Sequence, residues 1–140
     1  MIVLDTNVVS ETMRPSPEPR VIDWLNRQEI TTLHLTTISL AELRFGIACL
    51  DPGRRRDDLD ARLGRMLAQV FTGRVLGFTE AAAPEYALRM ADARRRGLSV
   101  GFADGAIGAI AAAAGHIVAS RDVAPFEALG IKIVDPWTAC

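Results

Sequence analysis

The sequence is poor in cysteine, which excludes several classes of protein. Its only cysteines, Cys49 and Cys140, lie too far apart to match a metal-binding or redox motif. A small secreted domain stabilised by disulfides is therefore excluded, and the composition agrees with a reducing cytosol, so we expect a cytoplasmic protein. Cys49 falls in an apolar helical pattern, where a cysteine behaves as a small core residue, and we expect it to be buried.

Lysine is almost absent, and the net charge is close to zero. Lys132 is the only lysine among 16 basic residues, and the formal net charge is −1 at pH 7. A generally basic nucleic-acid coat protein is excluded, so any nucleic-acid contact must come from a local patch. The densest patches are the arginine triplets at 54–56 and 94–96, which can be either solvated helix ends or phosphate contacts.

Long hydrophobic runs are also missing. The longest, residues 106–114, is too short to span a bilayer, and the first apolar run breaks at Asp5, so no signal peptide is expected. The 140 residues are 49% hydrophobic and 24% charged, which fits a single domain (1–140) with a substantial core.

Short apolar runs alternate with helical patterns along the chain. Strands are expected at residues 2–4, 33–37, 74–78, 116–119 and 132–134. Helices are expected at residues 16–28, 39–50, 54–71, 79–96, 105–114 and 123–129. This alternation predicts an α/β fold with a parallel sheet of four to five strands and helices on both faces. Ser39 and Glu42 also have the S-x-x-E spacing of a capping box, which predicts that Ser39 caps its helix.

Four acids occur where a strand ends or a helix begins: Asp5, Glu42, Asp104 and Asp122. Each has a local explanation. Asp5 could shape a turn, Glu42 could complete the capping box, and the other two could be N-terminal caps. However, the carboxyl ends of parallel strands share one edge of the sheet, where ligands bind. We therefore expect the four carboxylates to converge there.

If the four carboxylates converge, the repulsion between their negative charges must be offset. One pair of charges 4 Å apart costs about 4 kcal/mol at an effective dielectric of about 20. Mg²⁺ and Mn²⁺ prefer oxygen ligands and would offset this repulsion. Because the set contains no nucleophilic Ser, Cys or His, it favours phosphodiester hydrolysis by metal-activated water.

The polar neighbours of the acids have two readings each. Asn7 and Ser120 can either form turns or hold carboxylates and metal-bound water in position. His34 lies inside a strand pattern and His116 precedes one, so both are interpreted as structural rather than catalytic.

Taken together, these pieces resemble the PIN-domain ribonucleases, specifically the VapC-type toxins of bacterial toxin–antitoxin pairs and their FitB-like relatives. The matching segments span almost the whole chain in the family's order. Relatives often carry proline before the Ala-Asp pair, where this chain has Phe102. The segments are residues 2–7, 39–46, 103–111 and 118–122, the last followed by Phe126 and Gly130.

By that resemblance, Asp5, Glu42 and Asp104 correspond to the three core acids of the family, and Asp122 falls on its fourth position. The resemblance implies a PIN-like sheet sandwiched by helices, endoribonuclease activity, Mg²⁺ or Mn²⁺, a homodimer and a small inhibitory antitoxin. The natural groove for the antitoxin is the helix pair around residues 43–50 and 59–70, unless these apolar faces pack only on each other and on the sheet.

We therefore predict a metal-dependent endoribonuclease that is the toxin of a type II toxin–antitoxin pair. Asp5 and Asp104 are predicted to bind the metal directly, and Glu42 and Asp122 to complete the catalytic cluster. Two alternatives stay open: a catalytically silent binding module of the same fold, and a nuclease that acts on structured DNA. A phosphatase with Asp5 as its nucleophile is disfavoured, because Asn7 stands where a second acid is expected.

Overall fold

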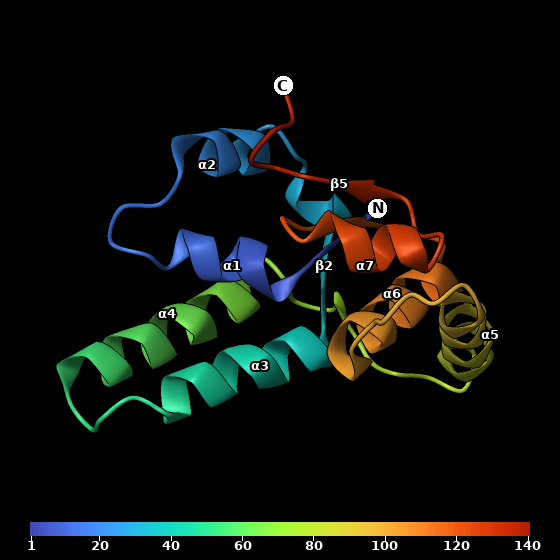
Figure 1. Ribbon diagram of the computed structural model, residues 1–140. Coiled ribbons are helices and arrows are strands. Elements are labelled where there is room, and N and C mark those ends of the chain that lie inside the picture. The colour runs from blue at the N-terminus through green and yellow to red at the C-terminus, as the bar shows by residue number, and fades with distance from the viewer.

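The computed structural model describes residues 1–140 and contains one fully parallel sheet (Figure 1). The five strands are β1 (Ile2–Leu4), β2 (Leu33–Thr36), β3 (Val75–Leu76), β4 (Ile117–Ala119) and β5 (Ile133–Val134). Their order in the sheet is β3-β2-β1-β4-β5. The prediction of a parallel α/β sheet is confirmed, and the strand order reverses between β1 and β4, which makes their carboxyl ends the expected place for a ligand.

Helices connect all of the strands. They are α1 (Thr6–Thr12), α2 (Pro19–Asn26), α3 (Thr37–Ala48), α4 (Arg54–Gln69), α5 (Ala82–Arg95), α6 (Phe102–Ala114) and α7 (Val123–Ala128), with a 3-10 turn η1 (Ile30–Thr32). Figure 1 shows α1, α3 and α4 on one side of the molecule, and α5 and α6 on the other. None of the helices combines the length and the hydropathy needed to cross a membrane.

The central strands are apolar on both faces because each face carries its own core. Leu4 and Ala119 pack into a core built with α1 to α4, whereas Val3 and Val118 pack into a second core with α5, α6 and α7. Successive side chains of a strand point to opposite faces, so adjacent residues of β1 serve different cores. This explains why these strands read as continuous apolar runs.

Helix α6 is the central helix that its composition predicted. Its residues from Gly105 to Ala111 are all buried, and it ends at Gly115 in the left-handed conformation, with φ of +71°. It begins at Phe102, three residues earlier than the predicted start at Gly105. Asp104 therefore lies inside the first turn of the helix and not in a preceding loop.

Two local predictions were wrong at the carboxyl edge of the sheet. Helix α1 was not expected, because Asp5 was read as the end of a strand followed by a turn. Asp5 in fact also caps α1, since its Oδ1 accepts the Thr6 backbone N–H at 2.7 Å. The capping box of Ser39 and Glu42 is also wrong, because α3 begins at Thr37 and Thr36 caps it by accepting the Ser39 N–H at 3.0 Å. Glu42 is thus released from any capping role.

The prediction for Cys49 was also wrong. It follows the last residue of α3 and is exposed, as is Cys140, and both are free thiols. The apolar face of α3 is instead formed by Leu43 and Ile47, which point toward α1 and α4.

Candidate active site

Asp5 lies at the end of β1, directly beside the end of β4. It is only 4% exposed, and its backbone N–H donates to the carbonyl of Ala119 at 2.9 Å. Its Oδ2 accepts a hydrogen bond of 2.7 Å from Ser120 Oγ, and its Oδ1 accepts from the Thr6 N–H. Asp5 is therefore held rigidly at the point where the strand order reverses.

Asn7 and Ser120 connect Asp5 to Asp122. Asn7 Nδ2 donates to Ser120 Oγ at 3.0 Å and to Asp5 Oδ2 at 3.4 Å. The backbone N–H of Asp122 donates to the same Ser120 Oγ at 3.0 Å, and the Arg121 N–H donates to Asn7 Oδ1 at 3.3 Å. These two side chains thus fix the loop after β4 against the start of α1, in addition to any turn they form.

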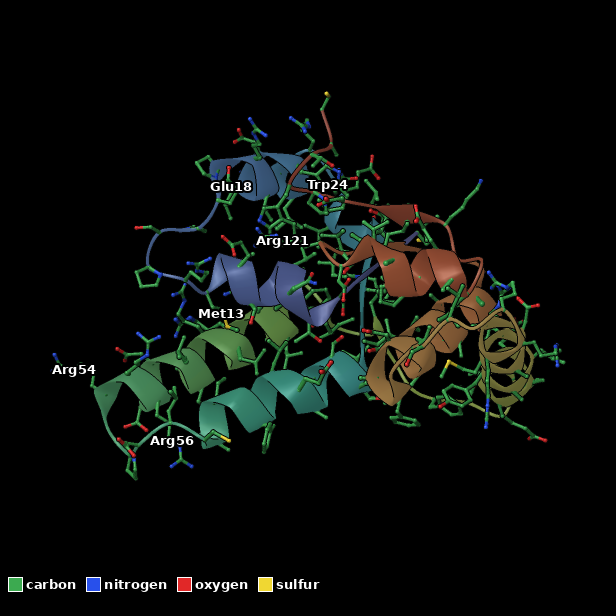
Figure 2. All side chains as sticks on the ribbon, in the orientation of Figure 1. Met13, Glu18, Trp24, Arg54, Arg56 and Arg121 are labelled. Carbon is green, nitrogen blue, oxygen red and sulfur yellow. The ribbon has the colours of Figure 1, made fainter.

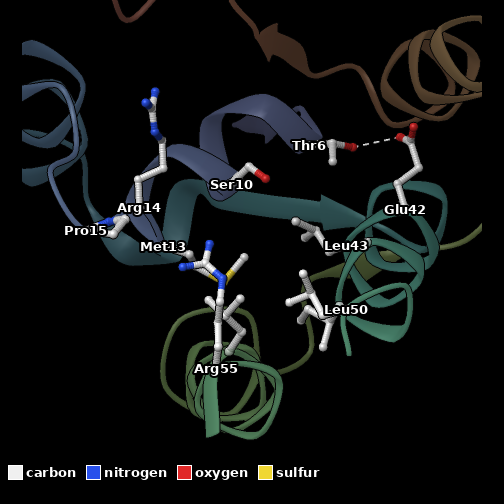
Figure 3. A pocket seen from close by; sticks show the side chains of 12 residues that line it. Thr6, Ser10, Met13, Arg14, Pro15, Glu42, Leu43, Leu50 and Arg55 are labelled. Carbon is white, nitrogen blue, oxygen red and sulfur yellow. Dashed lines mark hydrogen bonds between the residues drawn. The ribbon is translucent and has the colours of Figure 1, made fainter. Parts of the chain in front are cut away.

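Glu42 reaches the same region from α3. Thr6 Oγ1 donates to Glu42 Oε1 at 2.8 Å, which joins the first residue of α1 to the second turn of α3 (Figure 3). Glu42 is exposed, so its second oxygen stays available to a ligand. Sequence reasoning missed the role of Thr6, although its place directly after Asp5 was the available signal.

Asp104 shows that the four acids share one electrostatic environment. Burial, and to a smaller extent the charges of Asp5, Asp122 and Glu42, raise the pKa of Asp104 to about 6. Burial also raises the pKa of Asp5, against the lowering effect of its hydrogen bonds from Ser120 and Thr6, while Glu42 and Asp122 add to the rise. The structure therefore places Asp5, Glu42 and Asp122 within electrostatic range of Asp104.

The cluster offers only carboxylate oxygens. No three His, Cys, Asp or Glu side chains of the structure lie close enough together to hold a metal ion without movement. Burial first, and then mutual repulsion of the carboxylates, raise the pKa values of Asp5 and Asp104 and so disfavour their charged forms. A hard divalent cation is the ligand that suits this donor set, because it prefers oxygen and removes the repulsion.

The two histidines lie at the other end of the sheet. His116 precedes β4 whereas Asp122 follows it, and the rings of His34 and His116 pack with their centroids 4.5 Å apart. His34 Nδ1 lies 3.1 Å from the Thr32 carbonyl, within hydrogen-bonding distance. Their positions agree with a structural role.

A groove between α1, α3 and α4 opens beside the cluster. Its volume is about 500 Å³, and its apolar lining includes Leu43, Leu50 and Leu59. Figure 3 shows Thr6 and Glu42 at one end of this groove and Arg14 and Arg55 toward the other. We call this the α1/α3/α4 groove. It has an acidic end, an apolar floor and a basic end.

The arginine triplets differ in their surroundings. Arg54 and Arg56 lie at the outer end of α4, away from the sheet (Figure 2), while Arg55 lines the α1/α3/α4 groove. Arg96 pairs with Asp92 at 2.9 Å and donates to the Ala128 carbonyl, so it ties the end of α5 to α7. Most of this charge therefore belongs to helix ends and not to the acid cluster.

The fold and the cluster can be compared with known proteins. Residues 2–132 match the family described as PIN domain. The chain belongs to the PIN-domain family. The resemblance read from the sequence is confirmed.

Named relatives of this PIN domain extend over its whole length. Plasmid stability protein StbB of Pseudomonas syringae pv. tomato is 47% identical over 139 residues, which is 99% of this chain and 100% of that protein. VapC ribonuclease Y4jK of Sinorhizobium fredii is 47% identical over 137 residues, 98% of each chain. Toxin FitB of Neisseria gonorrhoeae is 39% identical, and the match covers 98% of this chain and 99% of that protein.

Solved structures of relatives have nearly the same fold. FitAcB from Neisseria gonorrhoeae superposes with a TM-score of 0.94 at 39% identity, and covers 99% of this chain and 100% of that chain. FitAB bound to the IR36 DNA fragment superposes with a TM-score of 0.94 at 37% identity, and the match covers 99% of this chain and 97% of that chain. The architecture of this PIN domain is thus shared with the matched chain of each structure.

Proposed function

We propose that this PIN domain is a metal-dependent endoribonuclease that acts as the toxin of a type II toxin–antitoxin pair. The observation that carries the proposal is that Asp5, Glu42 and Asp122, which come from three other elements, interact electrostatically with Asp104 of α6: burial first, and then these three charges, raise the pKa of Asp104 to about 6. The names of two relatives, VapC ribonuclease and Toxin FitB, support the same conclusion.

Asp5 and Asp104 are the side chains that would hold the cation directly, because both are partly or fully buried and carry raised pKa values. Glu42 and Asp122 would complete its surroundings. When bound, Mg²⁺ or Mn²⁺ supplies charge neutralisation for an anionic substrate and lowers the pKa of an attacking water.

The chain's own residues do the positioning. Ser120 and Asn7 fix the Asp5 carboxylate and the loop that carries Asp122. Thr6 holds one oxygen of Glu42 and leaves the other free to accept a proton from water as the phosphodiester is attacked. Because no Ser, Cys or His side chain is placed as a nucleophile in this cluster, direct attack by water is the route that we assign.

The α1/α3/α4 groove is the surface that we assign to the antitoxin. Solved relatives include the FitAB complex, and the groove begins at Thr6 and Glu42 of the cluster itself. An amphipathic helix whose apolar face covers Leu43, Leu50 and Leu59 would reach the catalytic acids from there. Inhibition would then follow from occupation of the site entrance.

A homodimer is part of the same proposal. The surface formed by α5 and the segment after it carries exposed apolar side chains, with Leu88 70% and Leu98 43% exposed. A neighbouring cavity of about 610 Å³ is lined by Met90 and Leu98. Burial of such a patch against a second copy would remove apolar surface from water.

The proposal is tested with purified protein and a panel of single-stranded RNA, duplex RNA, single-stranded DNA and structured DNA. Cleavage of RNA in Mg²⁺ or Mn²⁺, abolished by EDTA, is the expected result. Cleavage of structured DNA in preference to RNA would establish the nuclease alternative. Absence of cleavage together with no thermal stabilisation by Mn²⁺ would establish the silent binding module, because a metal that binds the folded state must raise its stability.

A further inference from the structure

Three aromatic side chains form a continuous contact at the carboxyl edge of the sheet. The rings of Tyr86 and Phe102 lie 5.7 Å apart between centroids, and Phe78 packs edge-on against Tyr86 at 6.0 Å. Phe78 follows the end of β3, and Phe102 is the first residue of α6. The cluster therefore lies on the same edge as the catalytic acids, and we call it the aromatic platform.

Gly105 fixes the position of this platform. A Cβ on Gly105 would lie 3.0 Å from Tyr86 Cε2 and 2.7 Å from Met90 Sδ, so a larger residue would push both side chains away. Gly105 is three residues after Phe102, which places both on the same side of the first turn of α6. The Tyr86 ring thus rests on this turn and supports the Phe102 ring from behind.

The exposure of Phe102 has no explanation in the packing of the chain. Its side chain is 65% exposed and that of Phe78 is 41% exposed, although both lie beside a well-packed helix. Phe102 and Asp104 lie in the same helical turn, but side chains two residues apart leave a helix on different sides. A flat apolar ring is thus presented to solvent at the same edge of the sheet as the acid cluster.

We propose that Phe102, supported by Tyr86 and Phe78, stacks on an unpaired base of the RNA next to the phosphate that is cleaved. The inference rests on the proposed function and specifies its substrate as single-stranded RNA. Bases in a duplex already stack on their neighbours, whereas an unpaired base has a free face for an aromatic ring. Stacking on an aromatic ring tolerates every base, so the platform selects strandedness more strongly than sequence.

The test uses a short single-stranded RNA that the wild type cleaves, together with versions that carry one abasic residue on either side of the scissile bond. The proteins are the wild type, Phe102→Ala, Phe102→Trp and the control Ile30→Ala, which removes an exposed apolar side chain from η1, at the opposite end of the sheet from the acids. We expect Phe102→Ala to raise KM about tenfold, equivalent to about 1.4 kcal/mol, with kcat changed less than about twofold. Phe102→Trp and Ile30→Ala should behave as wild type.

The abasic substrates separate stacking from other effects. At one flanking position, loss of the base should cost the wild type about tenfold in kcat/KM and cost Phe102→Ala nothing further. An equal abasic penalty in both proteins would overturn the inference. The inference would also be overturned if Phe102→Ala dissociated a dimer while the loss of kcat/KM on the abasic substrate stayed the same as in the wild type. That result would assign the platform to contact between two copies of the chain. If the wild type cleaves no RNA in Mg²⁺ or Mn²⁺, the proposed function fails first, and the inference with it.

Discussion

Ser120 Oγ donates a 2.7 Å hydrogen bond to Asp5 Oδ2, across 115 positions of the sequence. The same oxygen accepts from Asn7 Nδ2 and from the Asp122 backbone N–H, so its single donor and both acceptor positions are used. One hydroxyl group therefore holds two of the four acids in register. Since Asp5 is almost fully buried, this bond also stabilises its charged form.

Ser120→Ala should weaken the site without unfolding the protein. Loss of a group that orients a metal ligand typically costs about 10- to 100-fold in metal affinity or activity, and we expect an effect of that size. The measurement is a titration of cleavage rate against Mn²⁺ concentration. Ser99→Ala, an exposed serine, is the control. An unchanged midpoint for Ser120→Ala would show that Asp5 needs no such support.

Asp104→Asn should increase the stability of the metal-free protein at neutral pH. The folded-state pKa of Asp104 is about 6, above the value of about 3.9 in an unfolded chain. Between these two pH values the folded state binds more protons than the unfolded state, so this group lowers the stability of the fold as pH rises from about 3.9 to about 6. Above the folded-state pKa the loss of stability stays at its full size. The variant should melt at a higher temperature than wild type at pH 7.5, and the gap should close toward pH 4.

The control for this comparison is Asp23→Asn, an exposed acid of α2. Addition of Mn²⁺ should reverse the order, because only the wild type gains stability from the bound cation. A variant that is less stable than wild type at pH 7.5 in EDTA would contradict the electrostatic account.

The sequence was sufficient for the parts of the fold that depend on local pattern. Apolar runs of β-branched residues revealed β1 and β4, and the small apolar residues of α6 indicated a central helix. The order of strands does not follow from such patterns, because pairing depends on contacts between distant segments. The contact between Tyr86 and Phe102 does not follow from them either, because it depends on how α5 crosses α6.

The candidate acids could be found for a related reason. Asp5 and Asp122 stand at changes of element and Asp104 lies in the first turn of α6, so position marked these three. Glu42 lies in the second turn of α3 and was marked through a capping box that the structure does not contain. Helix α1 was missed because Asp5 acts both as the end of a strand and as a helix cap, and the sequence pattern displays only the first role.

Glu11→Gln should make the protein less stable at neutral pH and less sensitive to acid. Glu11 is buried, and its Oε1 accepts the Glu18 backbone N–H at 2.8 Å. This bond, aided by Arg14 and opposed by burial, lowers the pKa of Glu11. The stabilisation is therefore present above the unfolded-state pKa of about 4.3 and is lost as pH falls through the folded-state value.

The free energy of unfolding at pH 7 should fall by about 1.5 to 3 kcal/mol, the usual contribution of a hydrogen bond to a charged group. Urea unfolding at several pH values measures it, with the exposed Glu29→Gln as control. A difference from wild type that stays constant down to pH 2 would show that the charge of Glu11 is not what stabilises the α1–α2 connection.

Gly46→Leu should block the antitoxin and spare catalysis. Gly46 lines the α1/α3/α4 groove, and a Cβ added there would meet no atom within 4 Å, so a side chain can fill the groove without disturbing α3. The affinity for the protein encoded by the neighbouring gene should fall at least about tenfold, or about 1.4 kcal/mol. Calorimetric titration measures this affinity.

Gly64→Leu is a matched control, because Gly64 on α4 also has open space around it and does not line the groove. RNA cleavage by both variants should equal that of wild type. Undiminished binding of the partner to Gly46→Leu would place the antitoxin on another surface.

The central claim is that Asp5 and its three companions form one metal-dependent ribonuclease site. Its most direct test is the initial rate of cleavage of a single-stranded RNA by Asp5→Asn and wild type in saturating Mn²⁺, with both proteins shown to be folded by circular dichroism. The account predicts that the amide variant loses at least about 100-fold in rate, since an oxygen ligand and its charge are removed from the site. Equal rates would contradict it.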